Sequence, residues 1–347
     1  MDSITQIVLG AAVGELIAGK KIGYKAALWG AFAGTIPDLD IIAGLWQDPI
    51  TYLSFHRGFS HSIFFAPIMA PLLAIIAIYI HKKELLPYRT WINLFFWALL
   101  THPLLDLFTG YGTQLLNPIS NYGFEINSIF IIDPLYTIPL LICLIVGLRK
   151  SNTDIKRTIW VKRGIYISSL YLILSLGLKY YGHTIIKNQA IDQGIVIHRM
   201  MSIPGPFTSF LWRGLIETED AFYQAYYSVF DDPSKELIFY KIPKSNVGLE
   251  LFESSRALET LKWFSKGFYT IESVENSNLA YAENVYFNDL RFGTLGGWDG
   301  NYNHHVFKFE IYKNEIGEIS FRQAPITTSI NSNDFITLLK KSFSLEK

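Results

Sequence analysis

The sequence predicts a polytopic α-helical membrane domain of about six segments, residues 1–182, followed by an α+β extracytoplasmic domain, residues 183–347. Hydrophobic residues make up 50% of the 347-residue chain and charged residues only 17%. The mean hydropathy is positive, +0.23. Long apolar runs dominate from Ile4 to Gly182, whereas the remainder has the composition of an ordinary soluble domain. This asymmetry places the membrane part first.

The individual runs justify the segments in chain order. Crossing a hydrocarbon core of ~30 Å takes about 18–20 apolar residues. The first two runs, Ile4–Ala18 and Lys25–Ile36, are shorter, and Gly19–Gly23 between them predicts a tight turn. The first is barely long enough to span, so a position in the membrane interface remains open for it. So many runs in succession exclude a soluble all-α domain. The later runs approach or reach the full length: Ile63–Ile80, Trp91–Leu107, Ile129–Leu148 and Gly164–Leu178.

The basic loops predict the orientation, because short loops rich in Lys and Arg stay cytoplasmic. Gly44–His61 contains only Arg57, and Tyr111–Ser128 contains neither Lys nor Arg. Basic and non-basic loops alternate, which places the N-terminus and the C-terminal domain outside. The basic loops hold Lys20, Lys21 and Lys25, then Lys82, Lys83 and Arg89, then Arg149, Lys150, Lys156, Arg157, Lys162 and Arg163.

Several other functions are excluded at this stage. The N-terminus lacks the basic region and cleavage site of a removable signal peptide. The single cysteine, Cys143, lies in an apolar run, which excludes a disulfide framework and a cysteine-based zinc site. The net charge is zero and no basic block with interleaved aromatics occurs, so nucleic acid is not an expected partner.

Two ionisable residues inside an apolar run carry the functional hypothesis. His102 and Asp106 stand four residues apart, on one face of a helix. Both are suitable ligands for zinc or a similar divalent ion. With the helix ending near Gly110, Asp106 lies ~6 Å and His102 ~12 Å below its outer end. The alternative is a hydrogen-bonded pair that only holds helices together.

Further candidate ligands lie on the same side of the membrane. Asp38 and Asp40 follow Pro37, which permits a non-helical backbone from which both could reach one ion; a solvated turn is the alternative. His56 and His61 flank Gly58 in an outer loop, whose bend could direct both imidazoles to one point. In that loop, Ser60 could cap the next helix. Arg57, the only cation of the outer loops, could hold a phosphate bidentately.

Weaker candidates complete the site. Asp133 precedes Pro134, so it is either a helix N-cap or a further ligand. Gln6 could orient a water or a ligand, and Gln114 lies in an outer loop that could touch substrate. Glu15 lies near the cytoplasmic end of its segment, pairs with a nearby Lys in our interpretation, and stays outside the site. The other histidines are interpreted as structural: His81, His183, His198, and the pair His304 and His305, expected on opposite faces of a strand.

The chain resembles the bacterial inner-membrane metal-dependent hydrolases of the YdjM/YbcI type. The resemblance implies a hydrolase in the bacterial inner membrane. It rests on Asp2–Glu15, Ala27–Gly30, Gly34–Asp40, His56–Ser62, Phe96–Ala98, Thr101–Asp106, Gly112–Leu115 and Asp133–Tyr136, and extends to Leu211–Arg213, Phe264–Tyr269 and Asp289–Gly293.

A more distant resemblance is to zinc-dependent phospholipase C and P1-type nucleases. That group gathers an N-terminal ligand, an Asp, a His and a His-x-x-x-Asp helix around a zinc cluster. Here Gln6 stands where that pattern has an N-terminal His, and no second His-x-x-x-Asp/Glu occurs. The resemblance therefore implies one or two ions, with zinc preferred, rather than three.

The C-terminal part predicts an α+β domain. Alternating runs predict strands, and Ser254–Phe264 has helical spacing. We expect a lid or substrate-guiding role for this domain. The strands are expected at Ile195–Met201, Phe210–Thr218, Ala221–Phe230, Glu236–Ile242, Phe268–Val274, Val285–Arg291, Val306–Tyr312 and Ile319–Gln323.

Two functional hypotheses follow. In the first, the chain is a metal-dependent hydrolase of a lipid or lipid-linked ester, most simply a phosphoester, using a metal-activated water. His102, Asp106, Asp38 or Asp40, and His56 or His61 bind the metal; the spare Asp acts as base and Arg57 stabilises charge. In the second, the same groups serve a transporter or metal-binding scaffold. A transporter should place polar groups at the midplane, whereas these lie toward one face, which favours hydrolysis.

Overall fold

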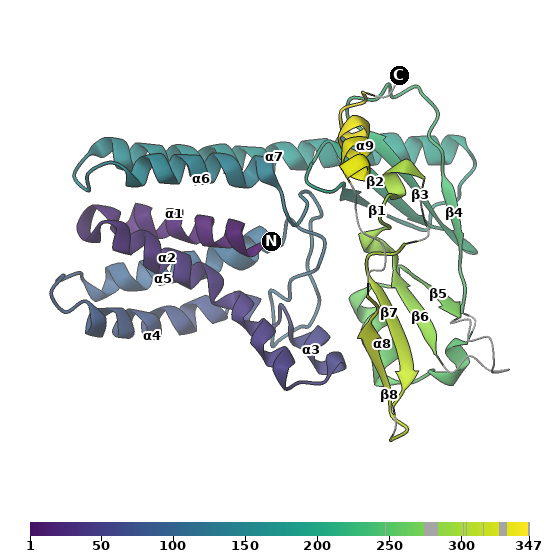
Figure 1. The fold of residues 1–347 in the computed structure, drawn as a ribbon, viewed down its shortest axis with the longest axis horizontal. Helices are drawn as coiled ribbons and strands as arrows, with labels where there is room; N and C mark the ends of the chain where they lie inside the picture. Colours follow the sequence, from purple (N-terminus) through teal and green to yellow (C-terminus); the bar gives the residue numbers. More distant parts are fainter. Residues whose placement is uncertain are drawn as a thin grey trace. The chain divides into compact units, whose positions relative to one another are not determined.

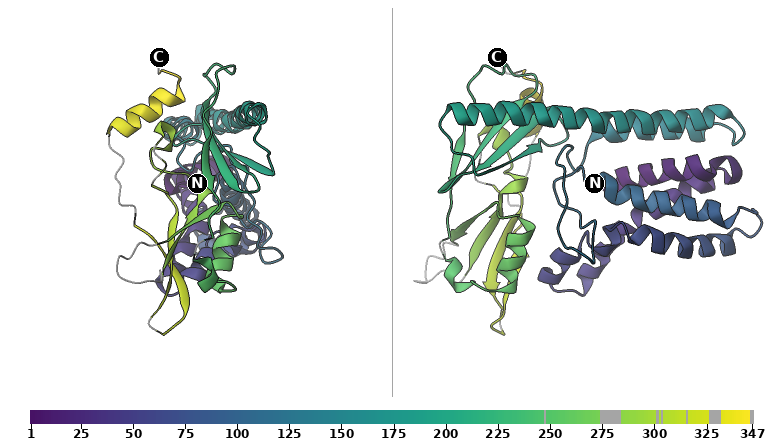
Figure 2. Two further views of the ribbon diagram at one scale, coloured as in Figure 1. Left: turned by 90° about the vertical axis from the view of Figure 1, so that its right-hand side faces the viewer. Right: turned by 180° about the vertical axis from the view of Figure 1, so that it is seen from behind.

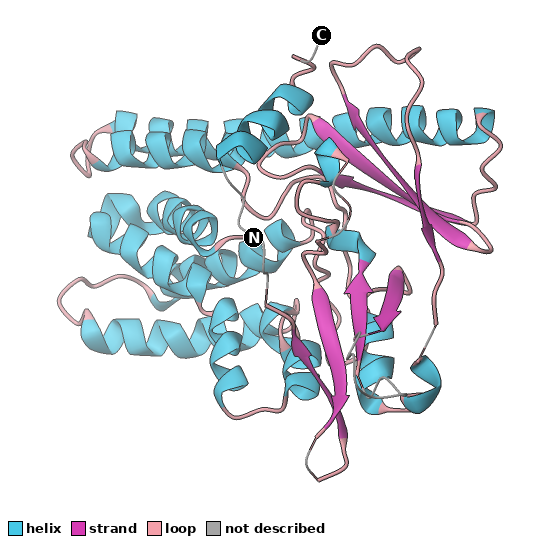
Figure 3. Cartoon of the chain, turned by 45° about the vertical axis from the view of Figure 1, so that its right-hand side comes forward, coloured by secondary structure: helices cyan, strands magenta, loops and turns pink. Residues whose placement is uncertain are grey.

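The computed structural model describes residues 1–246, 248–273, 284–300, 302, 304–314, 316–325 and 332–345. The chain forms two compact units, Met1–Leu45 with Phe55–Leu176, and Trp46–Ser54 with Gly177–Lys347. Within the described residues, the first unit is built of helices and every named strand belongs to the second (Figure 3). A helical N-terminal region followed by a domain of two antiparallel sheets is therefore confirmed.

The helices from α1 to α7 follow the predicted apolar runs, with two differences. The turn expected within Gly19–Gly23 is present but shorter: α1 continues to Ile22, and the chain turns only at Gly23, whose φ of +64° suits glycine. Three short helices between α2 and α4 were not predicted. The elements are α1 (Ser3–Ile22), α2 (Tyr24–Thr35), η1 (Pro37–Leu45), α3 (Pro49–Phe55), η2 (Phe59–His61), α4 (Phe65–Ile80), α5 (Tyr88–Asp106), α6 (Pro134–Leu148) and α7 (Ile155–Asp192).

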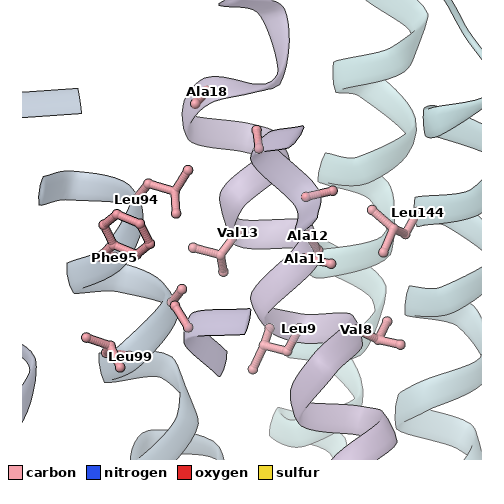
Figure 4. Close-up of a cluster of buried hydrophobic side chains, with 14 of the residues drawn as sticks. Val8, Leu9, Ala11, Ala12, Val13, Ala18, Leu94, Phe95, Leu99 and Leu144 are labelled. Atoms are coloured by element: carbon pink, nitrogen blue, oxygen red, sulfur yellow. The ribbon is translucent and has the colours of Figure 1, made fainter. Parts of the chain in front are cut away.

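Helix α1 lies at the centre of the helical unit. Figure 4 shows its small and β-branched side chains between Leu94, Phe95 and Leu99 of α5 on one side and Leu144 of α6 on the other. Helices α1, α2, α4 and α5 lie side by side (Figure 1). Since the buried side chains of α1 are mostly small, its neighbours approach closely.

Glycines bring α1 and α2 into backbone contact. A Cβ at Gly14 would lie 2.2 Å from the Ala26 carbonyl oxygen, and one at Gly30 would lie 2.1 Å from that of Gly10. Such small-residue interfaces let helix backbones touch within membranes. The same contact continues to Gly34, where a Cβ would lie 2.8 Å from the Gln6 carbonyl oxygen. Gln6 and Gly34 are thereby held together at one end of the helix pair.

The described helices contain between one and three candidate membrane spans. Among the described helices, α7 alone is long and apolar enough to cross a membrane, and it runs as one helix of 38 residues (Figure 2). Two bent pairs bring the number to three if each counts as one span: α2 with η1, bent by 48°, and Pro49–His61 with α4, bent by 68°. Six segments are not confirmed, because α1 and α5 carry ionisable residues and α6 has only 15 residues.

The second unit contains two four-stranded antiparallel sheets, each with its strands in chain order. The strand predictions are confirmed to within a few residues, except that Val274 lies outside the described residues. Helix α9 (Ser332–Ser342) was not predicted. The first sheet is β1 (Arg199–Pro204), β2 (Leu211–Glu217), β3 (Ala221–Ser228) and β4 (Tyr240–Pro243); the second is β5 (Tyr269–Ser273), β6 (Val285–Asp289), β7 (Lys308–Lys313) and β8 (Ile319–Gln323). Short helices connect them: η3 (Leu249–Leu251), α8 (Arg256–Phe264), η4 (Leu290–Phe292) and η5 (Gly297–Asp299).

One strand prediction is wrong in detail. His304 and His305 were expected inside a strand, but β7 begins only at Lys308. His305 instead forms an isolated bridge with Thr294. The chain is therefore paired with the loop after β6 before it enters the regular ladder.

Candidate metal centre

Four side chains converge at the glycine-held end of the helical unit. Asp38, His61, His102 and Asp106 each offer a ligand atom, and the atoms all lie within 4.8 Å of one another. Asp38 comes from η1, His61 ends η2, and the other two occupy the last turns of α5. The Nε2 atoms of His61 and His102 are 3.2 Å apart, and each is 3.3 Å from Asp38 Oδ1. Asp106 Oδ2 lies 3.6 Å from His61 Nε2 and 3.9 Å from His102 Nε2.

Hydrogen bonds on the far side of each ring fix its tautomer. Nδ1 of His102 donates to the Gly34 carbonyl oxygen at 2.6 Å. Nδ1 of His61 lies 3.0 Å from Ser60 Oγ, which itself donates to Asp40 Oδ2. Ser60 Oγ therefore accepts from His61. Both Nε2 atoms are left as acceptors that face each other. Such outer partners typically orient metal-binding histidines.

The four acceptor atoms fit a single divalent ion. A tetrahedron with bonds of ~2.0–2.1 Å, the values for zinc, has edges of about 3.3–3.4 Å. Five of the six separations run from 3.2 to 3.9 Å, and the sixth, between the two carboxylates, is within 4.8 Å. Asp106 Oδ2 is buried and has no hydrogen-bond partner among the residues that the structure describes. One proton cannot bridge four acceptors, whereas an ion at their centre can, so the donor set suits a metal ion.

The other oxygen of Asp106 is held by protein donors. Gln6 Nε2 donates to Oδ1 at 2.9 Å and lies 3.2 Å from the His102 carbonyl oxygen. The Met1 amino group also donates to Oδ1. The structure thus places Gln6 where it orients Asp106, and it leaves Oδ2 directed at the cluster.

Arg57 lies beside the cluster in an unusual backbone conformation. Its φ is +58°, a left-handed value that costs a non-glycine residue about 1 kcal/mol or more. Its N–H donates to Asp40 Oδ2 at 2.9 Å, and its carbonyl oxygen accepts from Gln114 N at 3.1 Å. The guanidinium stacks 4.6 Å from the Tyr111 ring, and its Nε lies 3.4 Å from Asp106 Oδ2. A buried cation is thus held at the edge of the metal centre.

Asp40 and His56 lie outside the four-atom group. Asp40 Oδ1 is 2.8 Å from His56 Nδ1, and Oδ2 receives hydrogen bonds from Ser60 and from the Arg57 N–H. The structure therefore gives Asp40 a positioning role around the site, and the ligand roles predicted for Asp40 and His56 stay predictions. Ser60 connects His61 to Asp40, and the predicted N-cap role is wrong, because Ser60 lies inside η2 and the N-cap of α4 is Phe64.

Two other candidates, Asp133 and Gln114, and Glu15, which was kept outside the site, have partners elsewhere. Asp133 accepts from the Leu135 N–H and from the Tyr171 hydroxyl, at 3.0 and 2.8 Å, as the N-cap of α6. The Gln114 side chain accepts from Asn117 at 3.0 Å. Glu15 forms a buried bidentate pair with Arg157, at 2.5 and 2.8 Å, so the expected pairing with a lysine of the next turn is wrong. Arg157 pairs with Glu15 in place of a lysine because its guanidinium can donate to both carboxylate oxygens at once.

Sequence reasoning missed some contributors. The Gly34 carbonyl oxygen fixes the His102 ring, and Thr109 accepts a long hydrogen bond of 3.4 Å from Arg57 Nη1. The first is a backbone atom and carries no signal of its own in the sequence. The regular spacing of Gly10, Gly14, Gly30 and Gly34 was the available clue that this end of α2 is held against α1.

The fold and this cluster define a helical membrane protein with a candidate metal site and a C-terminal domain of two sheets. The chain belongs to the YdjM inner membrane protein family, whose family model matches residues 1–186. It is also similar to the uncharacterized protein YfhP of Bacillus subtilis (strain 168), with 28% identity over 238 residues, 64% of this chain and 67% of that protein. No solved structure matches. The family resemblance is confirmed, and the likeness to phospholipase C and P1-type nucleases stays a prediction.

Proposed function

We propose that this chain is a membrane-embedded, metal-dependent hydrolase of a lipid or lipid-linked phosphoester. The observation that carries the proposal is the pair of facing Nε2 acceptors of His61 and His102, with two carboxylates completing the set. We propose zinc, because two imidazoles and two carboxylates at tetrahedral separations are a donor set that zinc accepts. The alternative is a site with two ions, the second of them near Asp40 and His56.

The proposed topology keeps six segments with the N-terminus and the C-terminal domain outside. Gln6 lies at the metal centre, while Lys20 and Lys21 stand about 21 Å further along α1 by helix rise. Since basic residues favour the cytoplasmic side, this separation supports a metal centre at the extracytoplasmic end.

The chain's own residues divide the work of binding and positioning. When bound, the metal supplies Lewis acidity toward a substrate oxygen and acidifies a water. Arg57 binds the anionic oxygens of the phosphoester, because a guanidinium presents several donors in one plane. Asp40 holds His56, Ser60 and the Arg57 backbone in place. Asp40, with three donors already bound, is thus a positioning residue in this scheme.

A non-catalytic transporter or metal-binding scaffold is the competing function. A transporter needs polar groups that lead from the site toward the opposite face. Glu15 is the candidate on that side, and its carboxylate is already matched by Arg157. Arg57 beside the ligands has no evident use in a site that only stores a metal. These two observations favour hydrolysis.

Metal analysis tests the proposal. We expect purified wild-type protein to hold about one equivalent of zinc by plasma mass spectrometry. His102→Ala should lose most of it, whereas His198→Ala, a change at an exposed histidine of the second unit, should retain it. Equal metal content in wild type and His102→Ala would contradict the metal site.

The reaction requires a second measurement. Wild type reconstituted in vesicles is assayed against a panel of phospholipids and polyprenyl phosphoesters for release of phosphate or headgroup. Turnover that disappears in His102→Ala supports the hydrolase. Full metal occupancy without turnover on any member of the panel favours the scaffold.

A further inference from the structure

Helix η1 has two chemically opposite sides. Its carboxylates, Asp38 and Asp40, are engaged with histidines of the site. Its large apolar side chains are exposed: Leu39 48%, Ile41 54%, Ile42 44% and Leu45 81%. The segment Pro37–Leu45 contains no Lys or Arg. Since residues three apart share a face of a 3₁₀-helix, the buried residues Pro37, Asp40 and Ala43 form one face of η1, and Leu39, Ile42 and Leu45 form another, which is uncharged and apolar.

Large apolar side chains are also exposed on α2, which precedes η1 along the chain, and on α4. Leu28 and Phe32 of α2 are exposed, and so are Ile68, Leu72 and Ile75 of α4. In a member of an inner membrane protein family, acyl chains are the medium that such helix faces contact. Because η1 follows α2 with only Ile36 between them, we expect its exposed apolar side chains to contact the same medium.

The length of α1 gives the level of η1 in the bilayer. Helix α1 starts at Ser3, beside the metal centre, and its 20 residues rise about 30 Å, the thickness of the hydrocarbon core. The metal centre therefore lies near one boundary of that core. η1 is bent by 48° from α2 at this level. An apolar helix turned aside at the boundary suits the interface, where amphipathic helices bury their apolar side among acyl chains.

We propose that η1 is inserted into the outer-leaflet interface, with Leu39, Ile42 and Leu45 among acyl chains and Asp38 on the side of the metal centre. The placement itself is independent of catalysis, and its consequence for substrate rests on the proposed function. The metal centre then lies at the depth at which lipid phosphoester groups are found. A lipid would present its phosphoester to Arg57 by lateral diffusion, without leaving the bilayer. The substrate class is thereby narrowed to lipids whose scissile phosphoester lies at the headgroup boundary.

The depth of η1 is measurable because the chain has one cysteine, Cys143, which is buried. In a Cys143→Ala background, Ile42→Cys is labelled with an environment-sensitive fluorophore and reconstituted in phosphatidylcholine–phosphatidylglycerol vesicles. Ile75→Cys on α4 is the lipid-facing reference, and Ser234→Cys in an exposed turn is the aqueous reference. Zinc content and circular dichroism verify that each variant is folded.

We expect lipids brominated near the top of the acyl chain to quench the Ile42→Cys label at least twofold more than the Ser234→Cys label. Iodide in the buffer should show the reverse order. Quenching at position 42 by iodide but not by brominated lipid would overturn the proposal. Protection from both quenchers would also overturn it, because another protein surface, such as a second copy, would then cover η1. Neither result depends on turnover, so failure here is distinct from failure of the hydrolase.

Discussion

Two buried arginines, one in each unit, have opposite surroundings. Arg57 and Arg213 are both only 4% exposed. Arg213, on β2, donates to Gln224 Oε1 at 3.1 Å and to the carbonyl oxygens of Leu290 and Arg291. Within the described residues, the guanidinium of Arg57 donates only a long hydrogen bond to Thr109, and its Nε, 3.4 Å from Asp106 Oδ2, has no hydrogen-bond partner. Burial of a charge therefore does not by itself mark a functional site.

The two arginines differ in the number of guanidinium donors that remain available to a ligand. The acceptors around Arg213 link β2 to the turn after β6, so the guanidinium holds the two sheets of the second unit together. Arg57 keeps donor capacity beside four converging acceptor atoms. We interpret Arg213 as a structural residue and Arg57 as a ligand-binding one. The predictions below test this contrast.

The largest expected effect is on the stability of the second unit. Arg213→Met removes the donors of two buried carbonyl oxygens and of Gln224, which should cost about 3–5 kcal/mol. For a unit of this size the midpoint of thermal unfolding should fall by roughly 6–20 °C in a detergent-solubilised full chain. Metal content should be unchanged.

The matched control for Arg213→Met lies on the neighbouring strand. Arg199 is half-exposed and pairs with Glu217 at 2.5 Å. Arg199→Met should change stability by about 1 kcal/mol or less, as is usual for surface ion pairs. Similar midpoints for the two variants would contradict a structural role specific to Arg213.

A smaller effect is expected from pH. Burial lowers the pKa of His305 to about 4, and Arg213 and Lys308 act in the same direction, against Glu272 and Asp289. With an ordinary pKa of 6.5, the unfolded chain binds more protons than the folded one between these values. The stability due to neutral His305 is present above about pH 6.5 and is lost as the pH falls to about 4, by at most about 3 kcal/mol.

The contribution of His305 can be separated from other acid effects. Full-chain wild type and His305→Phe are unfolded thermally at pH 7 and at pH 4.5. The loss of stability on acidification should be smaller in His305→Phe. An equal loss in the two proteins would show that the titration of another group is responsible.

The sequence was sufficient for much of the fold because apolar runs and alternation are local signals. They located most helices and strands, while α9, α3 and the short 3₁₀-helices, η1 among them, were missed. The site was partly predictable: His102 and Asp106, at i and i+4, face one way on any helix. Which of Asp38 and Asp40 is the ligand could not be predicted from the sequence. In a 3₁₀-helix successive residues rotate by about 120°, so residues two apart point in different directions. Asp38 faces the ligand group and Asp40 faces His56 only because η1 has that geometry.

Arg57→Met should have the smallest effect on stability and a large effect on the binding of phosphate. One long hydrogen bond is lost, and the left-handed backbone at position 57 strains Met as much as Arg. In the zinc-loaded protein the ion compensates the charge of Asp106 after the guanidinium is removed. The free energy of unfolding should therefore change by about 1 kcal/mol or less. Binding of inorganic phosphate to the zinc-loaded protein should weaken roughly 10- to 100-fold, the value of charge-assisted hydrogen bonds of about 1.5–3 kcal/mol.

Titration calorimetry with inorganic phosphate measures this loss, and Arg256→Met, at an exposed arginine of the second unit, is the control. Undiminished phosphate binding in Arg57→Met would remove the contrast with Arg213, because the unused donors of Arg57 would then serve no ligand. Loss of zinc from Arg57→Met would instead assign Arg57 to the support of Asp106. If Arg57→Met binds phosphate more weakly and keeps its zinc, the result supports a guanidinium whose donors bind the substrate.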